Sequence, residues 1–336
     1  MSKKERKFSV KVPKYRQPFC DLFQKSSERR NWHRNCYITK RALQRGWAPN
    51  KGVYRSMKFW KMNGAGNDFV IVNNMDGAID AEKYGIIAKT LCERHMSIGA
   101  DGMMFVEKPQ GEADYRMVFY NSDGSMGEMC GNGARCICRY GYENGLAGEV
   151  QTVETTAGIV IGHRMDSRMY RIRLNDPSVL EADYPVELDG TIRQCAYVEL
   201  GDPGIPHAVV PIVGLDDFPE RLLFDLGRKL RYHEAFPKGA NVNFYEIVGE
   251  DEIFERTYER YVEDFTYACG TGTGSVVSVL TKKGLVSGKN VKVNMTGGQL
   301  IIDVDFDGEK VRNIYLTGPT NIVCKGEVTD EDLVLN

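Results

Sequence analysis

Met129-Cys130-Gly131-Asn132-Gly133-Ala134-Arg135 is a stretch that recurs, with changes, in the second half of the chain as Ala268-Cys269-Gly270-Thr271-Gly272-Thr273-Gly274. Each copy places a cysteine directly before a glycine-rich segment that is predicted to begin a helix. The free N–H groups and the positive dipole end of a helix N-terminus favour a negative charge beside them. A thiol in such a position can have its pKa lowered from about 8.5 to roughly 3.5–7.5. We therefore expect two reactive cysteines, Cys130 and Cys269, with lowered pKa values.

The segments around the two cysteines repeat at matched distances. Cys130 precedes Gly145 by the same interval that separates Cys269 from Gly284, and each glycine is expected to end a helix. Two further turns of the first half have counterparts in the second: Thr156-Ala157-Gly158 with Thr296-Gly297-Gly298, and Gly99-Ala100-Asp101 with Gly239-Ala240-Asn241. A repeat of about 140 residues has the size of a domain and is too long for a solenoid unit. The sequence thus predicts two α/β domains related by a pseudo-twofold axis, with Cys130 and Cys269 facing each other across a cleft.

Regular secondary structure is expected from Met57 onward. Apolar runs bounded by glycine-rich turns predict short strands at residues 59–62, 69–72, 103–106, 115–120 and 254–258. Helices are expected over residues 81–95 and over residues 133–143. This mixture of short strands and helices indicates an α/β (α+β) fold.

The composition is that of a globular protein in a reducing environment. Of 336 residues, 42% are hydrophobic and 27% are charged, and there is no run of 18 or more apolar residues that would predict a membrane span. Nine cysteines without close metal-type pairing suggest free thiols rather than a disulfide framework. We expect a cytoplasmic location. Core packing is expected for Cys92, Cys136, Cys138, Cys195 and Cys324.

The N-terminal segment, residues 1–56, has a different character. It contains 16 lysines and arginines but three acids, whereas the whole chain has a net charge of −2. Without a sustained apolar period, this basic N-terminal extension is predicted to be disordered. Three interpretations stay open: an upstream extension with Met57 as the true initiator, a basic arm that contacts nucleic acid or another anionic partner, and an organelle transit peptide.

Two symmetric thiols indicate a different reaction from that of one activated cysteine. A single cysteine with a histidine base is typical of acyl transfer. A thiolate and a thiol on opposite sides of a planar intermediate can remove a proton from one face and return one to the other. This favours racemisation or epimerisation next to a carboxylate, whose developing charge would be stabilised by N–H groups of Gly131, Asn132, Gly270 and Thr271. Because no pyridoxal-phosphate lysine motif or metal cluster is evident, we expect no cofactor and no metal.

Several motifs carry a resemblance to a known family over nearly all of residues 57–336. They are Gly64-Ala65-Gly66-Asn67-Asp68-Phe69, Ser97-Ile98-Gly99-Ala100-Asp101-Gly102, Asn121-Ser122-Asp123-Gly124-Ser125, Gly204-Ile205-Pro206-His207, Gly239-Ala240-Asn241-Val242, Glu259-Arg260 and the two cysteine stretches. Together they are similar to the motifs of the diaminopimelate epimerases, cofactor-independent enzymes with two catalytic thiols. The resemblance implies two domains, each a mixed β-sheet curled around a central helix, with the active site between them. It assigns residues 57–175 and 320–336 to one domain and residues 176–319 to the other, and it suggests a homodimer.

The resemblance also implies roles for individual residues. Cys130 and Cys269 match the acid/base pair, and His207 matches a supporting position beside the thiols. The substrate-binding positions are matched by Asn67, Asn121, Gly131, Asn132, Asn241, Glu259, Arg260, Gly270 and Thr271. The implied activity is epimerisation of LL-2,6-diaminopimelate to the meso form, in the synthesis of lysine and peptidoglycan precursors. Without the resemblance, the two asparagines of the first half could be turn residues, the histidine a loop residue and Glu259-Arg260 exposed charges.

Departures from the family pattern leave the substrate open. Ile205 stands where many members have asparagine, and bulky Tyr261, Phe265 and Tyr267 follow Arg260 where small residues are common. These side chains either pack on their own loop or reshape the pocket for another amino acid, histidine being one candidate. A further interpretation is a non-enzymatic protein that associates with nucleic acid through the basic extension, the one part of the chain that hints at such a partner.

Overall fold

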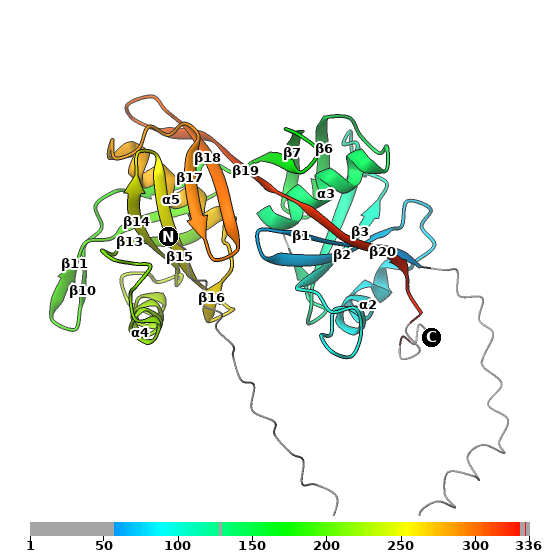
Figure 1. The fold of residues 1–336 in the computed structure, drawn as a ribbon, viewed down its shortest axis with the longest axis horizontal. Helices are drawn as coiled ribbons and strands as arrows, with labels where there is room; N and C mark the ends of the chain where they lie inside the picture. The colour runs from blue at the N-terminus through cyan, green and yellow to red at the C-terminus, as the bar shows by residue number, and fades with distance from the viewer. Residues whose placement is uncertain (1–56, 128–129, 330–332, 334–336) are drawn as a thin grey trace, which may run out of the picture. The chain divides into compact units, whose positions relative to one another are not determined.

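The computed structural model describes residues 57–127, 130–329 and 333, and Figure 1 shows how their helices and strands are arranged. The basic extension of residues 1–56 and Met129 lie outside the described residues. The disorder expected for that extension therefore stays a prediction.

Two series of elements follow each other along the described part of the chain, and each contains two α-helices, the second of which has 13 residues. The first series is β1 (Lys58–Gly64), β2 (Asn67–Asn73), the 3-10 helix η1 (Ala81–Lys83), α2 (Tyr84–Leu91), β3 (Gly102–Glu107), β4 (Tyr115–Asn121), β5 (Met126–Gly127), α3 (Gly131–Glu143), β6 (Val150–Thr155), β7 (Gly158–Arg164) and β8 (Met169–Arg173). The connecting strands are β9 (Pro177–Glu181) and the hairpin of β10 (Val186–Leu188) and β11 (Thr191–Arg193). The second series is β12 (Ala196–Leu200), β13 (Ile205–Pro211), α4 (Glu220–Arg231), β14 (Asn241–Gly249), β15 (Glu252–Glu259), β16 (Asp264–Thr266), α5 (Gly270–Lys282), β17 (Val291–Met295), β18 (Gly298–Phe306) and β19 (Val311–Pro319), followed by β20 (Asn321–Glu327).

The strand pairings of the two series are the same. In the first series β1 pairs with β2 antiparallel, β2 with β3 parallel, β3 with β4 antiparallel and β4 with β6 parallel. In the second series the same sequence of pairings joins β12, β13, β14, β15 and β17. A helix lies in each parallel connection, as the crossover between parallel strands requires. The predicted internal repeat and the α/β fold class are confirmed by this topology.

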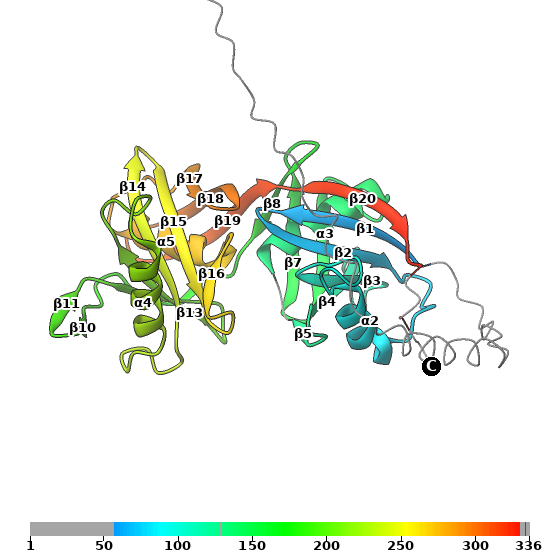
Figure 2. The same ribbon diagram turned by 60° about the horizontal axis from the view of Figure 1, so that its bottom comes forward.

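Equivalent strands also join the two series to each other. β8 pairs antiparallel with β19, with Ile172 opposite Leu316. β9 follows β8 and pairs with β12, whereas β20 follows β19 and pairs with β1; Figure 2 shows β20 running beside β1. Among the described residues, eighteen strands therefore form one continuous hydrogen-bonded sheet.

The long helices α3 and α5 each lie against the strands of their own series. α3 packs on β1, β2, β7 and β8, and α5 packs on β12, β13, β14, β18 and β19. Both helices are followed by a glycine in the left-handed region, Gly145 and Gly284, each with φ 67°. In both, the N–H of the next leucine donates to a carbonyl of the preceding turn, which closes the end of the helix. The predicted glycine stops are confirmed.

The helix predicted over residues 81–95 is shorter than expected. η1 leads directly into α2, which ends at Leu91. The chain then turns, and His95 has a φ of 74°. The guanidinium of Arg94 turns back toward Asp68 and Asp101, to which it donates hydrogen bonds. These contacts hold the segment in a turn that a continuing helix could not make.

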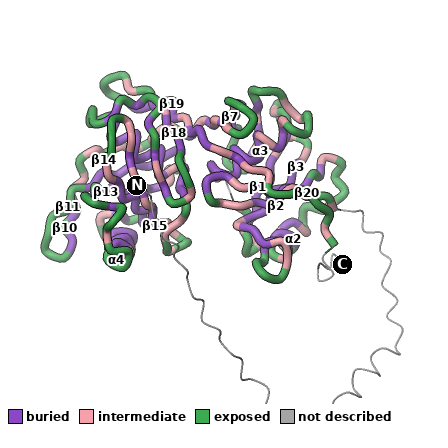
Figure 3. Tube along the Cα trace, viewed as in Figure 1, coloured by how far each residue is buried: buried purple, intermediate pink, exposed green. Residues whose placement is uncertain are grey.

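Buried positions follow the strands and the two long helices, whereas the connecting loops are exposed (Figure 3). Ile137 of α3, Val276 of α5 and the joining residues Ile172 and Leu316 belong to one apolar cluster. Burying each such side chain contributes about 1.5–3 kcal/mol, so the junction between the series is part of the core. Within the described part of the chain, none of the helices has the length and apolar character needed to span a membrane.

Candidate active site

Cys130 and Cys269 occupy equivalent positions at the beginning of α3 and α5. Each is the N-cap residue, with φ −123° and ψ 121° at Cys130 and φ −117° and ψ 103° at Cys269. The first N–H groups of a helix have no intrahelical acceptor and are free to bind an anion. N–H groups of the first turn point at each sulfur, from Gly133 and Asn132 toward Cys130 and from Gly272 toward Cys269. α3 thus begins earlier than expected, at Gly131, and the sulfurs lie directly at the two helix N-termini.

The first turns of α3 and α5 meet each other. A methyl group placed on Gly131 would lie 3.9 Å from Cα of Gly270, and one placed on Gly270 would lie 3.8 Å from Cα of Gly131. The side chain amide of Asn132 donates to the carbonyl of Ala268, the residue before Cys269, at 3.3 Å. Residues from opposite halves of the sequence are therefore neighbours in the structure.

Burial decides how readily the two thiols ionise. It raises the pKa of Cys130 above its usual value, and it raises the pKa of Cys269 well above. The N–H groups act in the predicted direction and lower both pKa values. Burial destabilises each thiolate by more than the N–H groups stabilise it, so both pKa values are raised. The prediction of lowered thiol pKa values is therefore wrong for this structure.

The charged side chains beside the two thiols are not the same. The guanidinium of Arg135, a fully buried residue of α3, lowers the pKa of Cys130. It also donates to the carbonyl of Gly131 at 3.2 Å and to Oδ1 of Asn132 at 2.7 Å. At Cys269 the side chains of Glu259 and Glu255 instead raise the pKa. The surroundings thus favour the thiolate at Cys130 more than at Cys269.

Glu259 acts on both thiols. It is the last residue of β15, and its charge raises the pKa of Cys130 as well as that of Cys269. Its carboxylate accepts a hydrogen bond from the hydroxyl of Thr266 at 2.6 Å and one from the thiol of Cys269. Burial raises the pKa of Glu259 itself. The hydroxyl of Thr271 lies 3.7 Å from the Cys269 sulfur and favours its thiolate.

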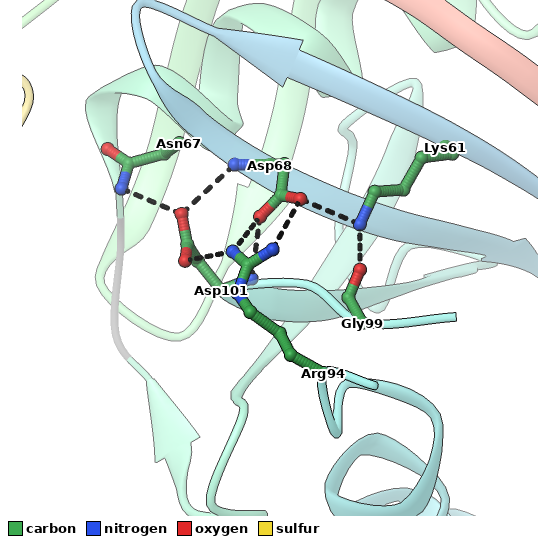
Figure 4. Close-up of polar contacts among 6 residues, drawn as sticks. All are labelled: Lys61, Asn67, Asp68, Arg94, Gly99 and Asp101. Atoms are coloured by element: carbon green, nitrogen blue, oxygen red, sulfur yellow. Dashed lines mark hydrogen bonds and ion pairs between the residues drawn. The ribbon is translucent and has the colours of Figure 1, made fainter. Parts of the chain in front are cut away.

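Asn67 is held at the first helix by a network of charged residues (Figure 4). Its Oδ1 accepts from the amide of Asn132 at 2.6 Å. Its Nδ2 donates to Asp101 at 3.1 Å, as Figure 4 shows. Arg94 bridges Asp101 and Asp68 at 2.8 and 2.7 Å. Although burial raises the pKa of Asp68, hydrogen bonds from Arg94 and from Lys61 hold it below its usual value. This network was not predicted, but Asp68 and Asp101 lie in the two glycine-rich motifs of the first half.

The remaining predicted site residues lie at the ends of strands. Oδ1 of Asn241, the first residue of β14, accepts from the backbone N–H of Arg260 at 2.8 Å. The guanidinium of Arg260 donates to the carbonyl of Lys238 at 2.9 Å. Asn121 ends β4, and its amide donates to the hydroxyl of Ser125 in its own turn at 3.0 Å. The structure thus joins Asn241 with Arg260 directly, whereas the side-chain amide of Asn121 bonds within its own loop.

His207 lies in a buried polar cluster that sequence reasoning missed. Its Nδ1 is 2.9 Å from Oδ1 of Asn243, whose amide donates to Glu255 at 3.0 Å and to Thr257 at 2.8 Å. Burial lowers the pKa of His207 to about 4 and raises the pKa of Glu255 to about 7. The available signal was the strand period: Glu255 is in phase with the apolar Ile253, so it faces inward.

The bulky residues after Arg260 have different surroundings. The ring of Phe265 packs with Tyr258, Phe224 and Phe244 in the second apolar cluster, which agrees with simple packing. Tyr261 is 80% exposed and lies under the guanidinium of Arg260, 4.7 Å from it. Tyr267 lies against the first half, since a methyl group on Gly66 would come within 2.4 Å of its Cβ. Ile205, half-buried, begins β13.

The polar groups of the candidate site are amides, helix N-terminal N–H groups, carboxyls and a guanidinium. Such groups bind the ammonium and carboxylate ends of an amino acid. Within residues 57–127, 130–329 and 333, no three His, Cys, Asp or Glu side chains are grouped so as to hold a metal ion.

Comparisons with known proteins cover both halves. The family model described as diaminopimelate epimerase matches residues 59–170 and 201–323. Diaminopimelate epimerase from Aquifex aeolicus (strain VF5) is 38% identical over 286 residues, which cover 82% of this chain and 99% of that one. Diaminopimelate epimerase from Archaeoglobus fulgidus is also 38% identical, over 280 residues, 80% of this chain and 95% of that one.

Solved structures extend the likeness of fold to more distant proteins. A hydroxyproline epimerase from Agrobacterium vitis has a TM-score of 0.59 at 16% identity, covering 82% of this chain and 91% of that one. A phenazine biosynthesis PhzC/PhzF protein from Clostridium difficile has a TM-score of 0.58 at 13% identity, covering 81% of this chain and 99% of that one. At these identities the solved structures show a common fold only. The family is shown by the family model and by the relatives that are 38% identical. With two cysteine-bearing helix N-termini that meet, and with matches over both halves, the chain belongs to the diaminopimelate epimerase family of isomerases.

Proposed function

We propose that this protein epimerises LL-2,6-diaminopimelate to meso-diaminopimelate without a cofactor, in the synthesis of lysine and peptidoglycan precursors. The observation that carries the proposal is the meeting of the two cysteine-bearing turns, with Gly131 against Gly270. The family match over residues 59–170 and 201–323 supports the same substrate. The proposal treats Cys130 and Cys269 as the acid/base pair.

In the proposed mechanism the two thiols stand on opposite faces of the substrate Cα. The thiolate of one cysteine takes the Cα proton, and the electron pair left on carbon delocalises into the α-carboxylate. The thiol of the other cysteine then gives its proton to the opposite face, which inverts the centre and leaves that cysteine as the thiolate. Each turnover thus moves the negative charge from one sulfur to the other, and proton exchange with water or a turnover in reverse restores the starting state.

The resting charge is expected on Cys130. Arg135 lowers the pKa of Cys130, whereas Glu255 and Glu259 raise the pKa of Cys269. A thiol with carboxyls beside it holds its proton, so Cys269 begins as the acid when Cys130 begins as the base. The opposite starting states that a two-base reaction needs are thus supported by Arg135 at Cys130 and by Glu255 at Cys269, while Glu259 raises the pKa of both thiols.

The helix N-termini are proposed to hold the α-carboxylate as its charge increases. N–H groups of Gly131 and Asn132 from α3 and of Gly270 and Thr271 from α5 lie on the two turns that meet. Donors fixed by helices need little reorganisation during the reaction, and removing one such donor costs about 10²–10³ in rate in comparable sites. Asn67, bound to Asn132 at 2.6 Å, is proposed to complete this end of the site.

The other end of the substrate is assigned to Asn121, Asn241, Glu259 and Arg260. Arg260 can bind a carboxylate through two parallel hydrogen bonds, and amide side chains can bind both ammonium and carboxylate groups. His207 is a supporting residue beside Asn241, its partner across the parallel pair β13–β14. The division into residues 57–175 with 320–336 and residues 176–319 is part of the same proposal.

A cytoplasmic location and a homodimer also belong to the proposal. The seven described cysteines are all free, as expected in a reducing compartment. The resemblance to the family supports the dimer. A nucleic-acid partner would depend on residues 1–56, which lie outside the described residues.

A second substrate class is favoured by one group of observations. Ile205 stands where many members of the family have asparagine, and the exposed Tyr261 follows Arg260 where small residues are common. An amino acid with a ring in place of the second carboxylate, such as histidine, could pack on them. Phe265 lends no support to this alternative, because its ring is packed against Tyr258.

The test is turnover by the full-length chain in deuterium oxide. LL-diaminopimelate and a panel of free amino acids that includes L-histidine are incubated separately, and Cα deuterium is measured by mass spectrometry. Meso product with one deuterium at the inverted carbon is the expected result. Deuterium uptake into another amino acid alone would support the two-thiol chemistry but show that the substrate is that amino acid. No uptake into any of them would contradict the proposal.

A further inference from the structure

The buried cluster of His207, Asn243, Glu255 and Thr257 has a fixed direction of hydrogen bonding. Oε1 of Glu255 accepts from two donors, the amide of Asn243 at 3.0 Å and the hydroxyl of Thr257 at 3.2 Å. The hydroxyl of Thr257, whose proton goes to Glu255, accepts from the same amide at 2.8 Å. Both acceptors require the NH₂ side of Asn243 to face them. The amide oxygen of Asn243 therefore has to face His207.

The direction of this chain of hydrogen bonds decides the tautomer of His207. An amide oxygen only accepts, so Nδ1 of His207, at 2.9 Å, has to carry the ring proton. Nε2 is then a lone-pair acceptor. It is buried, and it has no hydrogen-bond partner among the described residues. A neutral ring agrees with the lowered pKa that burial gives His207.

The cluster also adjoins the second thiol. A methyl group placed on Gly272, in the first turn of α5, would lie 2.0 Å from Nδ2 of Asn243 and 3.2 Å from the sulfur of Cys269. Asn243 is thus packed against the turn that carries the thiol. On β13, His207 pairs with Asn241, a proposed substrate-binding residue.

We propose that Glu255 is a positioning residue that acts through Asn243 to hold His207 in the Nδ1–H form, leaving Nε2 free to accept a hydrogen bond from a donor on the substrate. The role of Glu255 is to fix which side of the Asn243 amide faces the imidazole. This inference rests on the proposed function of the site for its kinetic consequence, but the tautomer is a property of the protein alone.

The direct test is nitrogen NMR of the full-length chain carrying ¹⁵N-labelled histidine, at pH 8. The signals of His207 are identified among those of the five histidines by their loss in His207→Gln. The expected pattern is a protonated Nδ1 and an unprotonated Nε2. A protonated Nε2 in the wild-type protein would overturn the proposal without any change at Glu255.

Three variants then test the part played by Glu255. Glu255→Leu removes the acceptor and is expected to give a mixture of ring tautomers. We expect kcat/KM for LL-diaminopimelate to fall about 10- to 100-fold, by analogy with groups that fix the tautomer of a metal-binding histidine through a hydrogen bond. Glu255→Gln retains an acceptor oxygen and is expected to restore the wild-type tautomer and most of the activity. Gln151→Leu is a matched control, because Gln151 is equally buried and accepts from Tyr115 at 2.8 Å within the first half.

The outcomes separate this proposal from the proposed function. Wild-type tautomer signals in Glu255→Leu, or an equal loss of kcat/KM in Gln151→Leu, would overturn the role of Glu255. If Glu255→Leu does not fold, a tautomer in Glu255→Gln that differs from the wild type would overturn it instead. Failure of the wild-type protein to turn over LL-diaminopimelate would contradict the proposed function, while the NMR experiment would still decide the tautomer.

Discussion

The first turn of α3 and the first turn of α5 have nearly the same backbone but unequal electrostatic surroundings. Cys130 and Cys269 are both extended N-cap residues, with φ values of −123° and −117°. Arg135 lies beside Cys130, at the position that Gly274 occupies in the second copy. Glu255 and Glu259 both act on Cys269 instead. The repeat thus supplies two equivalent helix N-termini, and the side chains around them make the two thiols unequal.

A two-base reaction needs one thiolate and one thiol. Two coupled thiols in identical surroundings can share one negative charge, but neither sulfur is then fixed as the base. Unequal surroundings decide which sulfur carries the charge at rest. Arg135 lowers the pKa of Cys130 and Glu255 raises that of Cys269, which favours the thiolate at Cys130. Glu259 acts on both sulfurs, so that a charge on one is coupled to the other. Four predictions test the comparison, from the largest effect to the smallest.

Replacing either thiol should abolish epimerisation. Cys130→Ser and Cys269→Ser are each expected to lose at least about 10²–10⁴-fold in kcat, because a serine hydroxyl is too weak an acid to replace the thiol. Steady-state turnover of LL-diaminopimelate measures the loss. Cys324→Ser serves as the control, since Cys324 is exposed on β20 and the core packing expected for it is wrong. Near-normal turnover by either active-site variant would show that one thiol is sufficient.

Removing the charge of Glu255 should change how stability depends on pH. Burial raises the pKa of Glu255 from 4.5 to about 7, so between these values the folded protein holds a proton that the unfolded chain has lost. The contribution of Glu255 to the free energy of unfolding is therefore fully present below pH 4.5 and is lost as the pH rises through 7. At about 1.4 kcal/mol per pKa unit, the loss amounts to about 3 kcal/mol. Urea unfolding of Glu255→Gln should show a gain over the wild type that grows by about this amount from pH 4.5 to 7.5.

His207, whose lowered pKa gives the opposite slope, is present in both proteins and cancels in the difference. A difference between Glu255→Gln and the wild type that stays constant with pH would show that Glu255 ionises with an ordinary pKa.

Adding a methyl group to the equivalent glycines of the two turns, Gly272 and Gly133, should lower the free energy of unfolding by unequal amounts. On Gly272 the methyl would lie 2.0 Å from Asn243, which Glu255, Thr257 and His207 hold in place. On Gly133 it would lie 2.4 Å from the terminal methyl of Met104, the end of a flexible side chain. Gly272→Ala is expected to cost about 1–3 kcal/mol, typical of overpacking, and Gly133→Ala less, as measured by urea unfolding at pH 7. Equal costs would mean that the buried cluster yields as easily as the methionine.

The smallest expected effects are changes in the reactivity of each thiol. Glu259→Gln removes a charge that opposes both thiolates, so alkylation of Cys130 and Cys269 by iodoacetamide at pH 8 should become a few-fold faster, because the thiolate is the reactive form. Arg135→Met should slow the alkylation of Cys130 and leave that of Cys269 nearly unchanged. Peptide mass spectrometry reads both sites in one sample. Slower alkylation of both cysteines in Glu259→Gln would reverse the assigned electrostatics.

Local patterns in the sequence were sufficient for much of the fold. The structure confirms the helix ends at Gly145 and Gly284, the matched turns and the cysteine before each long helix. Each of these features depends on residues that are neighbours in the sequence. The end of α2 was missed because it depends on Arg94 reaching Asp68, which lies far earlier in the chain. No periodicity records a contact of that kind.

The candidate site was predictable in its residues more than in its energetics. That the two cysteine-bearing segments lie close together was predicted from the repeat, although the contact between Gly131 and Gly270 was not. The raised thiol pKa values did not, because burial depends on the whole fold and here outweighs the N–H groups. The cluster at Glu255 was missed because a glutamate in a strand is usually solvent-exposed, and only its phase with Ile253 marked it as buried.

The central claim, that two separate groups carry the proton on the two faces, is tested most directly by following deuterium early in the reaction. LL-diaminopimelate is incubated with the full-length wild-type protein in deuterium oxide, and at about one-tenth conversion the recovered substrate and the product are analysed separately. The account predicts one deuterium at the inverted carbon of the meso product and almost none in the remaining LL substrate, because the solvent-derived proton is delivered to the opposite face. Deuterium appearing in the recovered substrate as fast as in the product would contradict it, because a single base serving both faces would return its proton to either side.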